Sequence, residues 1–136
     1  MTSRGAAPRA VVAGHGDFAR GLVSAVQQIS GTGEVFETVS NATLGAEGLA
    51  DAIGAAVSAS GAAVIFTDLP AGSCTVAARR VARTNPQLAV VTGANLAMLL
   101  DFALGGQTTT AALDRAVEKG RLAMQVLPGE EAGGAR

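Results

Sequence analysis

The sequence predicts an α/β protein built on a single, mostly parallel, doubly wound sheet. Short apolar runs rich in β-branched residues alternate with segments of helical periodicity, which is typical of right-handed βαβ crossovers. The strand-like runs are continuously apolar instead of alternating with polar residues, as in strands that are buried on both faces. We therefore expect helices on both faces of the sheet.

Five apolar runs are the predicted strands. They span residues 10–13, 35–39, 62–67, 88–92 and 122–126. The last run follows its helix almost directly, so we expect it to be an edge strand, either antiparallel or paired with another chain.

Segments with helical spacing separate these strands. The apolar residues that share one helix face are Phe18, Leu22, Ala25 and Ile29 in the first segment and Leu49, Ile53 and Val57 in the second. A third helix should begin at Ser73, a favourable N-cap residue, and end near Arg83. We expect a fourth helix over 95–104. A fifth should begin at 108–110 and end at Gly120, which suits the C′ position.

Composition limits the class of protein. A chain of 136 residues suits one domain with a sizeable core, which we place at residues 9–127 between flexible tails at 1–8 and 128–136. A net charge of −1 gives no reason to expect nucleic acid or an anionic membrane as a partner. A single cysteine, Cys74, and the lack of an apolar leader favour the cytoplasm. With only one histidine as well, we expect no structural zinc site.

The only histidine, His15, lies between two glycines directly after the first predicted strand. A strand that ends in Gly14-His15-Gly16 and leads into a helix places the imidazole at the carboxyl edge of the sheet, where open α/β sheets bind ligands. The unperturbed pKa of histidine leaves the side chain largely neutral and nucleophilic near neutral pH. His15 is therefore the first candidate for chemistry, and a solvated or capping histidine is the alternative.

The turn over residues 67–73 holds the other candidates. If the first and third strands are neighbours, Asp68 faces His15, and a carboxylate that accepts the Nδ1–H leaves the Nε2 lone pair free. N–H groups at the helix start near Gly72 and Ser73 would bind an anion. This combination suggests phosphoryl transfer to histidine. Alternatively Asp68 and Ser73 are only caps, and Cys74 is a small buried residue or a reactive thiol at a helix start.

A nucleotide-binding module is an alternative from another class. Residues 14–19 match the dinucleotide fingerprint G-x-G-x-x-G/A after a first strand. The acid expected at the end of the second strand is missing, since Val39 is followed by Ser40-Asn41. The fingerprint is therefore a weak signal here.

Three segments together resemble the enzyme IIA domains of the mannose-type sugar phosphotransferase system. They are the Gly-His-Gly-Asp-Phe-Ala-Arg-Gly-Leu segment at 14–22, the Thr-Asp-Leu-Pro-Ala-Gly-Ser segment at 67–73 and the Val-Thr-Gly-Ala-Asn-Leu-Ala-Met-Leu-Leu segment at 91–100. The resemblance implies a parallel sheet of order 2-1-3-4 and a fifth, antiparallel strand that two subunits exchange. The chain departs from the family pattern at Ala71, Cys74 and Ala97, where the family has Gly, Pro and Pro.

The same resemblance implies a cytoplasmic, homodimeric phosphocarrier without a cofactor or metal. His15 would accept a phosphoryl group from the phosphocarrier HPr and pass it to a sugar-specific IIB component, which serves the membrane components IIC and IID. Asp68 would orient His15, and Ser73, Gly72 and Gly16 would bind phosphate. The phosphotransfer subunit of dihydroxyacetone kinases is the alternative, but it usually has serine where this chain has Gly16.

Overall fold

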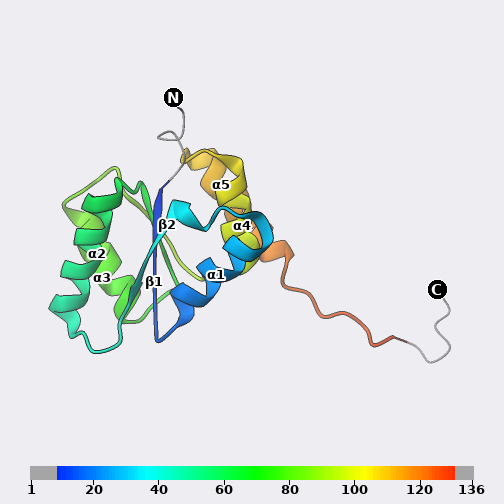
Figure 1. The fold of residues 1–136 in the computed structure, drawn as a ribbon, viewed down its shortest axis with the longest axis horizontal. Helices are drawn as coiled ribbons and strands as arrows, with labels where there is room; N and C mark the ends of the chain where they lie inside the picture. Colours follow the sequence, from blue (N-terminus) through cyan, green and yellow to red (C-terminus); the bar gives the residue numbers. More distant parts are fainter. Residues whose placement is uncertain (1–8, 131–136) are drawn as a thin grey trace.

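The computed structural model describes residues 9–130 and contains a four-stranded, all-parallel sheet of order β2-β1-β3-β4 (Figure 1). The strands are β1 (Ala10–Gly14), β2 (Phe36–Ser40), β3 (Val64–Thr67) and β4 (Ala89–Val91). The helices are α1 (Phe18–Ser30), the 3-10 turn η2 (Gly33–Val35), α2 (Ala46–Ser60), α3 (Ser73–Arg83), α4 (Leu96–Gly105) and α5 (Thr110–Leu122). The predicted fold class and strand order are confirmed. The tails predicted at 1–8 and 128–136 lie outside the described residues, except 128–130, which form no regular element.

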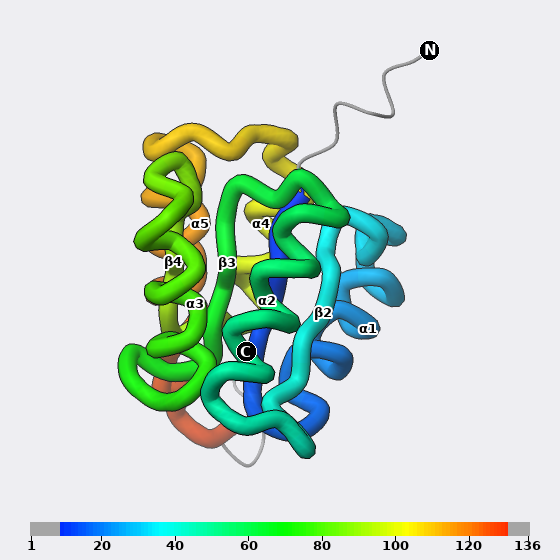
Figure 2. The backbone as a smooth tube through the Cα atoms, turned by 90° about the vertical axis from the view of Figure 1, so that its left-hand side faces the viewer, coloured from blue at the N-terminus to red at the C-terminus, as the bar shows by residue number. Residues whose placement is uncertain are grey.

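The helices form a layer on each face of the sheet, as the continuous apolar strands predict. Helices α2 and α3 cover one face and α1, α4 and α5 the other (Figures 1 and 2). Successive strand residues alternate between the layers: Val11 and Ile65 pack under α2 and α3, whereas Val12 and Phe66 pack under the other three helices. Within residues 9–130, none of the helices has both the length and the apolar character needed to cross a bilayer.

Three phenylalanines form the centre of the layer under α1, α4 and α5. Phe66 on β3 packs edge-on against Phe102 of α4, with ring centroids 5.1 Å apart, and against Phe36 of β2 at 6.4 Å. Phe66 is fully buried. These contacts join the sheet to the helix that follows β4.

Replacing Phe66 with alanine should lower the free energy of unfolding by about 3–5 kcal/mol, because a large cavity would open between the sheet and α4. Urea unfolding followed by far-ultraviolet circular dichroism measures this loss. Leu104→Ala is the control: Leu104 is exposed at the end of α4, so we expect a change within about 0.5 kcal/mol. Equal effects of the two substitutions would contradict this description of the core.

The predicted strand at 122–126 is not present. Helix α5 continues to Leu122, and the N–H groups of Ala123 and Met124 bond to the carbonyls of Lys119 and Arg121. The residues from 123 to 130 form no strand and lead away from the sheet (Figure 1). A short apolar run does not by itself specify a strand, because it needs an adjacent sheet edge to bond with. Pairing of this run with another chain stays a prediction.

Gly120 is not the C′ residue of α5, contrary to the prediction, but a buried position inside the helix. A Cβ there would lie 3.1 Å from Asn95 Oδ1 and 3.2 Å from Met98 Cβ, so the missing side chain lets α5 pack closely on α4. Asn95 caps α4 by accepting from the Met98 N–H at 3.0 Å, and its Nδ2 donates to the Gly120 carbonyl at 2.9 Å. The glycine therefore serves helix packing.

Candidate functional site at the carboxyl edge of the sheet

The turn after β1 presents His15 at the carboxyl edge of the sheet. The His15 carbonyl accepts from the Phe18 N–H at 3.0 Å, which closes the turn just as α1 begins. Gly16 has a φ of +55°, a region that favours glycine. A Cβ at Gly14 would lie 2.5 Å from Phe18 Cδ2, so any larger residue would displace the Phe18 side chain at the helix start. The His15 side chain is left 48% exposed.

The end of β2 holds this turn in place. Ser40 Oγ donates to the Gly16 carbonyl at 2.8 Å, and Asn41 Oδ1 accepts from the Gly16 N–H at 3.2 Å. The Asn41 N–H donates to the Gly14 carbonyl at 3.2 Å. In the sequence, Ser40 and Asn41 were notable only because they stand where a dinucleotide-binding protein would have an acidic residue. Their position directly after a strand that neighbours β1 was the signal that pointed to this role.

His15 and Asp68 are brought together by the pairing of β1 with β3. Ala13 and Thr67 are partners in the parallel register, so the residues that follow each strand lie side by side. Asp68 Oδ2 lies 2.7 Å from His15 Nδ1 and also accepts the His15 backbone N–H at 2.9 Å. An ionised carboxylate can only accept, so Nδ1 carries the proton and the Nε2 lone pair is free.

Asp68 is held in its ionised form. Burial raises the pKa of its carboxyl, but the hydrogen bonds from the His15 ring and backbone N–H and the electrostatic attraction between the carboxylate and this ring lower it by more, so this pKa lies below its usual 3.8. A carboxyl whose pKa is lower in the folded chain than in the unfolded chain stabilises the fold. This stabilisation is fully present when the pH lies above the pKa of the unfolded chain. That contribution is lost as the pH falls through the folded-state pKa.

We therefore expect Asp68→Asn to reduce the acid sensitivity of the fold. The difference in stability between wild type and variant should be largest near neutral pH and should shrink as the pH falls below about 4. Thermal unfolding at a series of pH values from 7 to 3 measures it. Asp51→Asn, a change at an exposed position on α2, is the matched control and should keep the pH dependence of the wild type. A constant difference between wild type and Asp68→Asn over this range would contradict the assignment.

Two buried threonines fix the loop that carries Asp68. Thr67, the last residue of β3, and Thr75, in the first turn of α3, share a hydrogen bond of 2.6 Å between their hydroxyl oxygens. Thr75 Oγ1 also donates to the Leu69 carbonyl at 2.5 Å. These bonds join the end of the strand, the loop and the start of α3 into one unit. The orientation of Asp68 is therefore tied to the start of α3.

The start of α3 lies beside the imidazole. Gly72 is its N-cap, with a φ of +122°, and a Cβ there would lie 3.9 Å from His15 Cε1. Ser73 is the first helical residue and not the predicted N-cap; its Oγ lies 3.5 Å from His15 Nε2. The first N–H groups of a helix have no partner inside it, so this helix end offers donors to an anion held at Nε2. The Gly16 N–H, by contrast, already donates to Asn41.

Cys74 lies directly beneath this pair of side chains. Cys74 is fully buried, which confirms the prediction of a small buried residue. Three atoms lie within 4.8 Å of one another here: the Cys74 Sγ, a carboxylate oxygen of Asp68 and a ring nitrogen of His15. Burial, and secondarily the Asp68 charge, raises the pKa of the Cys74 thiol, while a hydrogen bond with Ser73 lowers it. Sequence reasoning missed this proximity, because the fold of the loop brings Cys74 back to Asp68.

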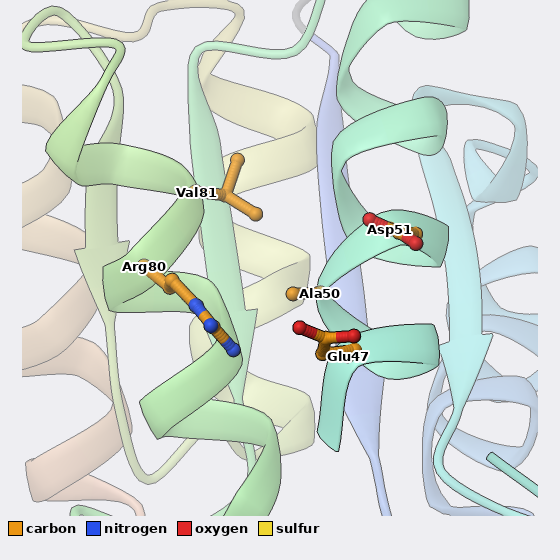
Figure 3. Close-up of a pocket in the computed structure, with 5 residues that line it drawn as sticks. All are labelled: Glu47, Ala50, Asp51, Arg80 and Val81. Carbon is orange, nitrogen blue, oxygen red and sulfur yellow. The ribbon is translucent and has the colours of Figure 1, made fainter. Parts of the chain in front are cut away.

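A separate pocket of about 330 Å³ lies between α2 and α3 (Figure 3). Its lining residues are Glu47, Ala50 and Asp51 of α2 and Arg80 and Val81 of α3. None of the predicted site residues contributes to it. The candidate site is therefore the edge where β1, β3 and α3 meet.

Open parallel α/β sheets bind ligands at the switch point of the strand order, and this chain places a histidine–aspartate pair and a helix start there. Similarity to known proteins identifies the family. The sequence model of the family described as "PTS system fructose IIA component", where PTS is the phosphotransferase system, matches residues 9–119. The chain belongs to this family of phosphotransferase enzyme IIA components. The matched region includes the Gly14–Gly16 turn, which also fits the dinucleotide fingerprint noted in the sequence.

Solved structures support the same fold. The phosphotransferase component EIIA of Streptococcus agalactiae aligns with a TM-score of 0.77 and 18% identity, covering 87% of this chain and 95% of that one. The mannose/sorbose-specific IIA subunit of Enterococcus faecalis gives 0.73 and 22%, with 92% and 98% covered. A IIA protein associated with the fucose utilization operon of Streptococcus pneumoniae gives 0.71 and 20%, with 88% and 92% covered. No curated protein sequence matches the chain.

Proposed function

We propose that the protein is a phosphocarrier that holds a phosphoryl group on His15 Nε2. The observation that carries this proposal is the 2.7 Å contact between His15 Nδ1 and Asp68 Oδ2, next to a ring that is 48% exposed. The carboxylate keeps the proton on Nδ1, so that Nε2 is the nucleophile and faces the start of α3. Asp68 is a positioning residue in this account, and Ser73 and Gly72 hold the phosphoryl oxygens.

The chemistry needs no cofactor. The Nε2 lone pair attacks the phosphorus of a phosphohistidine donor, the N–P bond of the donor breaks, and the donor imidazole keeps that electron pair. The His15 ring then carries a positive charge that the Asp68 carboxylate stabilises. N–H groups and the Ser73 hydroxyl at the start of α3 stabilise the transferred oxygens. Passing the group to the next acceptor is the same step in reverse, with the His15 ring as leaving group.

The proposed donor is the phosphocarrier HPr and the proposed acceptor is a sugar-specific IIB component, in the cytoplasm. Mixing the chain with ³²P-labelled phospho-HPr should transfer one label per chain, stable in alkali and lost in acid, as expected for a phosphoramidate. Adding IIB should then remove the label from the chain. A label that is stable in acid, or no transfer at all, would contradict the proposal. Delivery of the label to a dihydroxyacetone kinase in place of IIB would assign the chain to that system.

We further propose that the phosphocarrier is a homodimer. The apolar side chains of Met124, Val126 and Leu127 are exposed, and the outer edge of β4 has no strand beside it in the described residues. Contact with a second copy would cover both features. Analytical ultracentrifugation should give a dimer for the full chain and a monomer for a chain that ends after Ala123. A monomeric full chain would contradict this part of the proposal.

A further inference from the structure

Three side chains that differ in chemistry meet at one point beneath the carboxyl edge of the sheet. His15 comes from the turn after β1, Asp68 from the loop after β3 and Cys74 from the first turn of α3. One ligating atom from each lies within 4.8 Å of the other two. From this convergence we propose that His15, Asp68 and Cys74 form a site for a divalent cation of the Zn²⁺ type, and that an occupied site cannot accept phosphate.

The donor set selects the kind of cation. Thiolate and imidazole are ligands that Zn²⁺ prefers, and a carboxylate completes a common third position, whereas Mg²⁺ and Ca²⁺ prefer oxygen alone. One thiolate and one carboxylate also balance the two positive charges of the cation. With one histidine and one cysteine, we expected no structural zinc site from the sequence. Three mixed ligands instead leave a fourth position open to water, as in zinc sites that exchange ligands.

The three donors must shift to share one cation. Zinc–nitrogen and zinc–oxygen bonds of about 2.0–2.2 Å at a tetrahedral angle separate the two ligand atoms by about 3.3–3.6 Å, and a zinc–sulfur bond of about 2.3 Å places the sulfur about 3.6 Å from each of them. The donor atoms lie within 4.8 Å of one another, so an inward movement of about 1 Å or less by the thiol or the exposed ring completes the site. His15 Nδ1 and Asp68 Oδ2 lie 2.7 Å apart, with one proton between them. The cation takes the place of that proton. The His15 side chain is exposed and 10% of the Asp68 side chain is accessible, so the cation enters from solvent, and the buried Cys74 thiol forms the floor of the site.

Cation binding and phosphorylation exclude each other because both require the same ring. When the cation binds Nδ1, the proton of the neutral imidazole moves to Nε2, so the lone pair that attacks phosphorus is lost. The Cys74 thiol releases its proton to water, and no oxidant or reductant is involved. The proposal of a cation site does not depend on the proposed function. The proposal that the cation blocks phosphate acceptance rests on the proposed function.

Cobalt substitution tests the site directly. Cys74 is the only cysteine and His15 the only histidine of the chain, so the untagged full-length protein gives an unambiguous signal. We expect Co²⁺ to bind one per chain with a thiolate-to-cobalt charge-transfer band in the near ultraviolet, and Zn²⁺ to displace it. Cys74→Ser should abolish the band, and both Cys74→Ser and His15→Gln should weaken Zn²⁺ binding at least about tenfold.

The controls separate this site from surface binding. Thermal unfolding confirms that Cys74→Ser is folded, and His15→Gln, at an exposed position, is a second ligand variant that spares the core. Asp51→Asn should bind Zn²⁺ as the wild type does. Binding without a thiolate band, or binding that neither ligand variant weakens, would overturn the site.

A second arm tests the block of phosphorylation. Zn²⁺ should lower phosphate acceptance from phospho-HPr by at least about tenfold in the wild type, a chelator should restore it, and Cys74→Ser should lose most of this sensitivity. Unchanged acceptance by the zinc-bound wild type would overturn the exclusion but not the site. A wild type that accepts no phosphate even without zinc would contradict the proposed function, and the cobalt spectrum would still decide the cation site.

Discussion

His15→Gln will accept no phosphate from phospho-HPr, whereas the wild type will accept one group per chain. Glutamine has no nucleophilic nitrogen, and the chain contains no second histidine that could replace His15. The variant should remain folded at the assay temperature, because the side chain is half exposed and does not belong to either core cluster. Radiolabel incorporation measures the loss of acceptance, and a thermal unfolding transition well above the assay temperature shows that this loss is chemical.

A residual label on His15→Gln would mean that another residue is the acceptor. The His15 ring contacts Asp68 and Ser73, and the chemistry of the label would distinguish these two residues as acceptors. An acyl phosphate on Asp68 is lost in both acid and alkali, and a phosphoserine is stable in acid. Either result would contradict the role that we propose for His15.

Asp68→Asn should slow phosphate acceptance by a factor on the order of 10²–10³. The structure indicates why transfer should be slower in this variant. The His15 backbone N–H donates to the same oxygen that faces Nδ1, and this backbone bond favours an amide oxygen at that place in the variant. The ring position is then largely kept. What the variant loses is the negative charge that stabilises the ring as it becomes positive.

Single-turnover transfer from phospho-HPr measures this effect, after thermal unfolding has shown that both chains are fully folded at the temperature and pH of the assay. Asp17→Asn is the matched control, because Asp17 is also an acid near His15 but pairs with Arg20 at the surface. It removes the same charge and should change the rate by no more than about threefold. Equal rates for wild type and Asp68→Asn would mean that Asp68 is only structural.

The sequence predicted the sheet because buried parallel strands leave a strong local signal. The runs that became β1 and β3 are apolar on both faces, and the helices that follow them begin close to the predicted positions. The prediction failed at 122–126, where a short apolar run after a helix has no local feature that distinguishes a strand from a helix end. Gly120 was misassigned for a similar reason, since its role depends on contact with Asn95 and Met98.

The part of the candidate site that lies at the ends of strands was predictable from the sequence. His15 and Asp68 each follow a strand, so the register of β1 with β3 alone brings them together. The network around Gly16 depends on Ser40 and Asn41, and the position of Cys74 depends on the Thr67–Thr75 hydrogen bond. The location of Ser40 and Asn41 directly after a predicted strand was visible in the sequence, but their hydrogen-bond partners and the position of Cys74 were not, because both depend on tertiary contacts.

The position of the phosphoryl group on the His15 ring is the sharpest test of the proposed roles of His15 and Asp68. The Asp68 carboxylate accepts the Nδ1–H, so the account predicts phosphate on Nε2 and a proton retained on Nδ1. Nitrogen and phosphorus nuclear magnetic resonance of the ¹⁵N-histidine-labelled chain, phosphorylated by phospho-HPr, distinguishes the two ring nitrogens, and the single histidine makes the assignment immediate. A phosphorus coupling to Nε2 is the predicted result. Phosphate on Nδ1, or on any residue other than His15, would contradict the account.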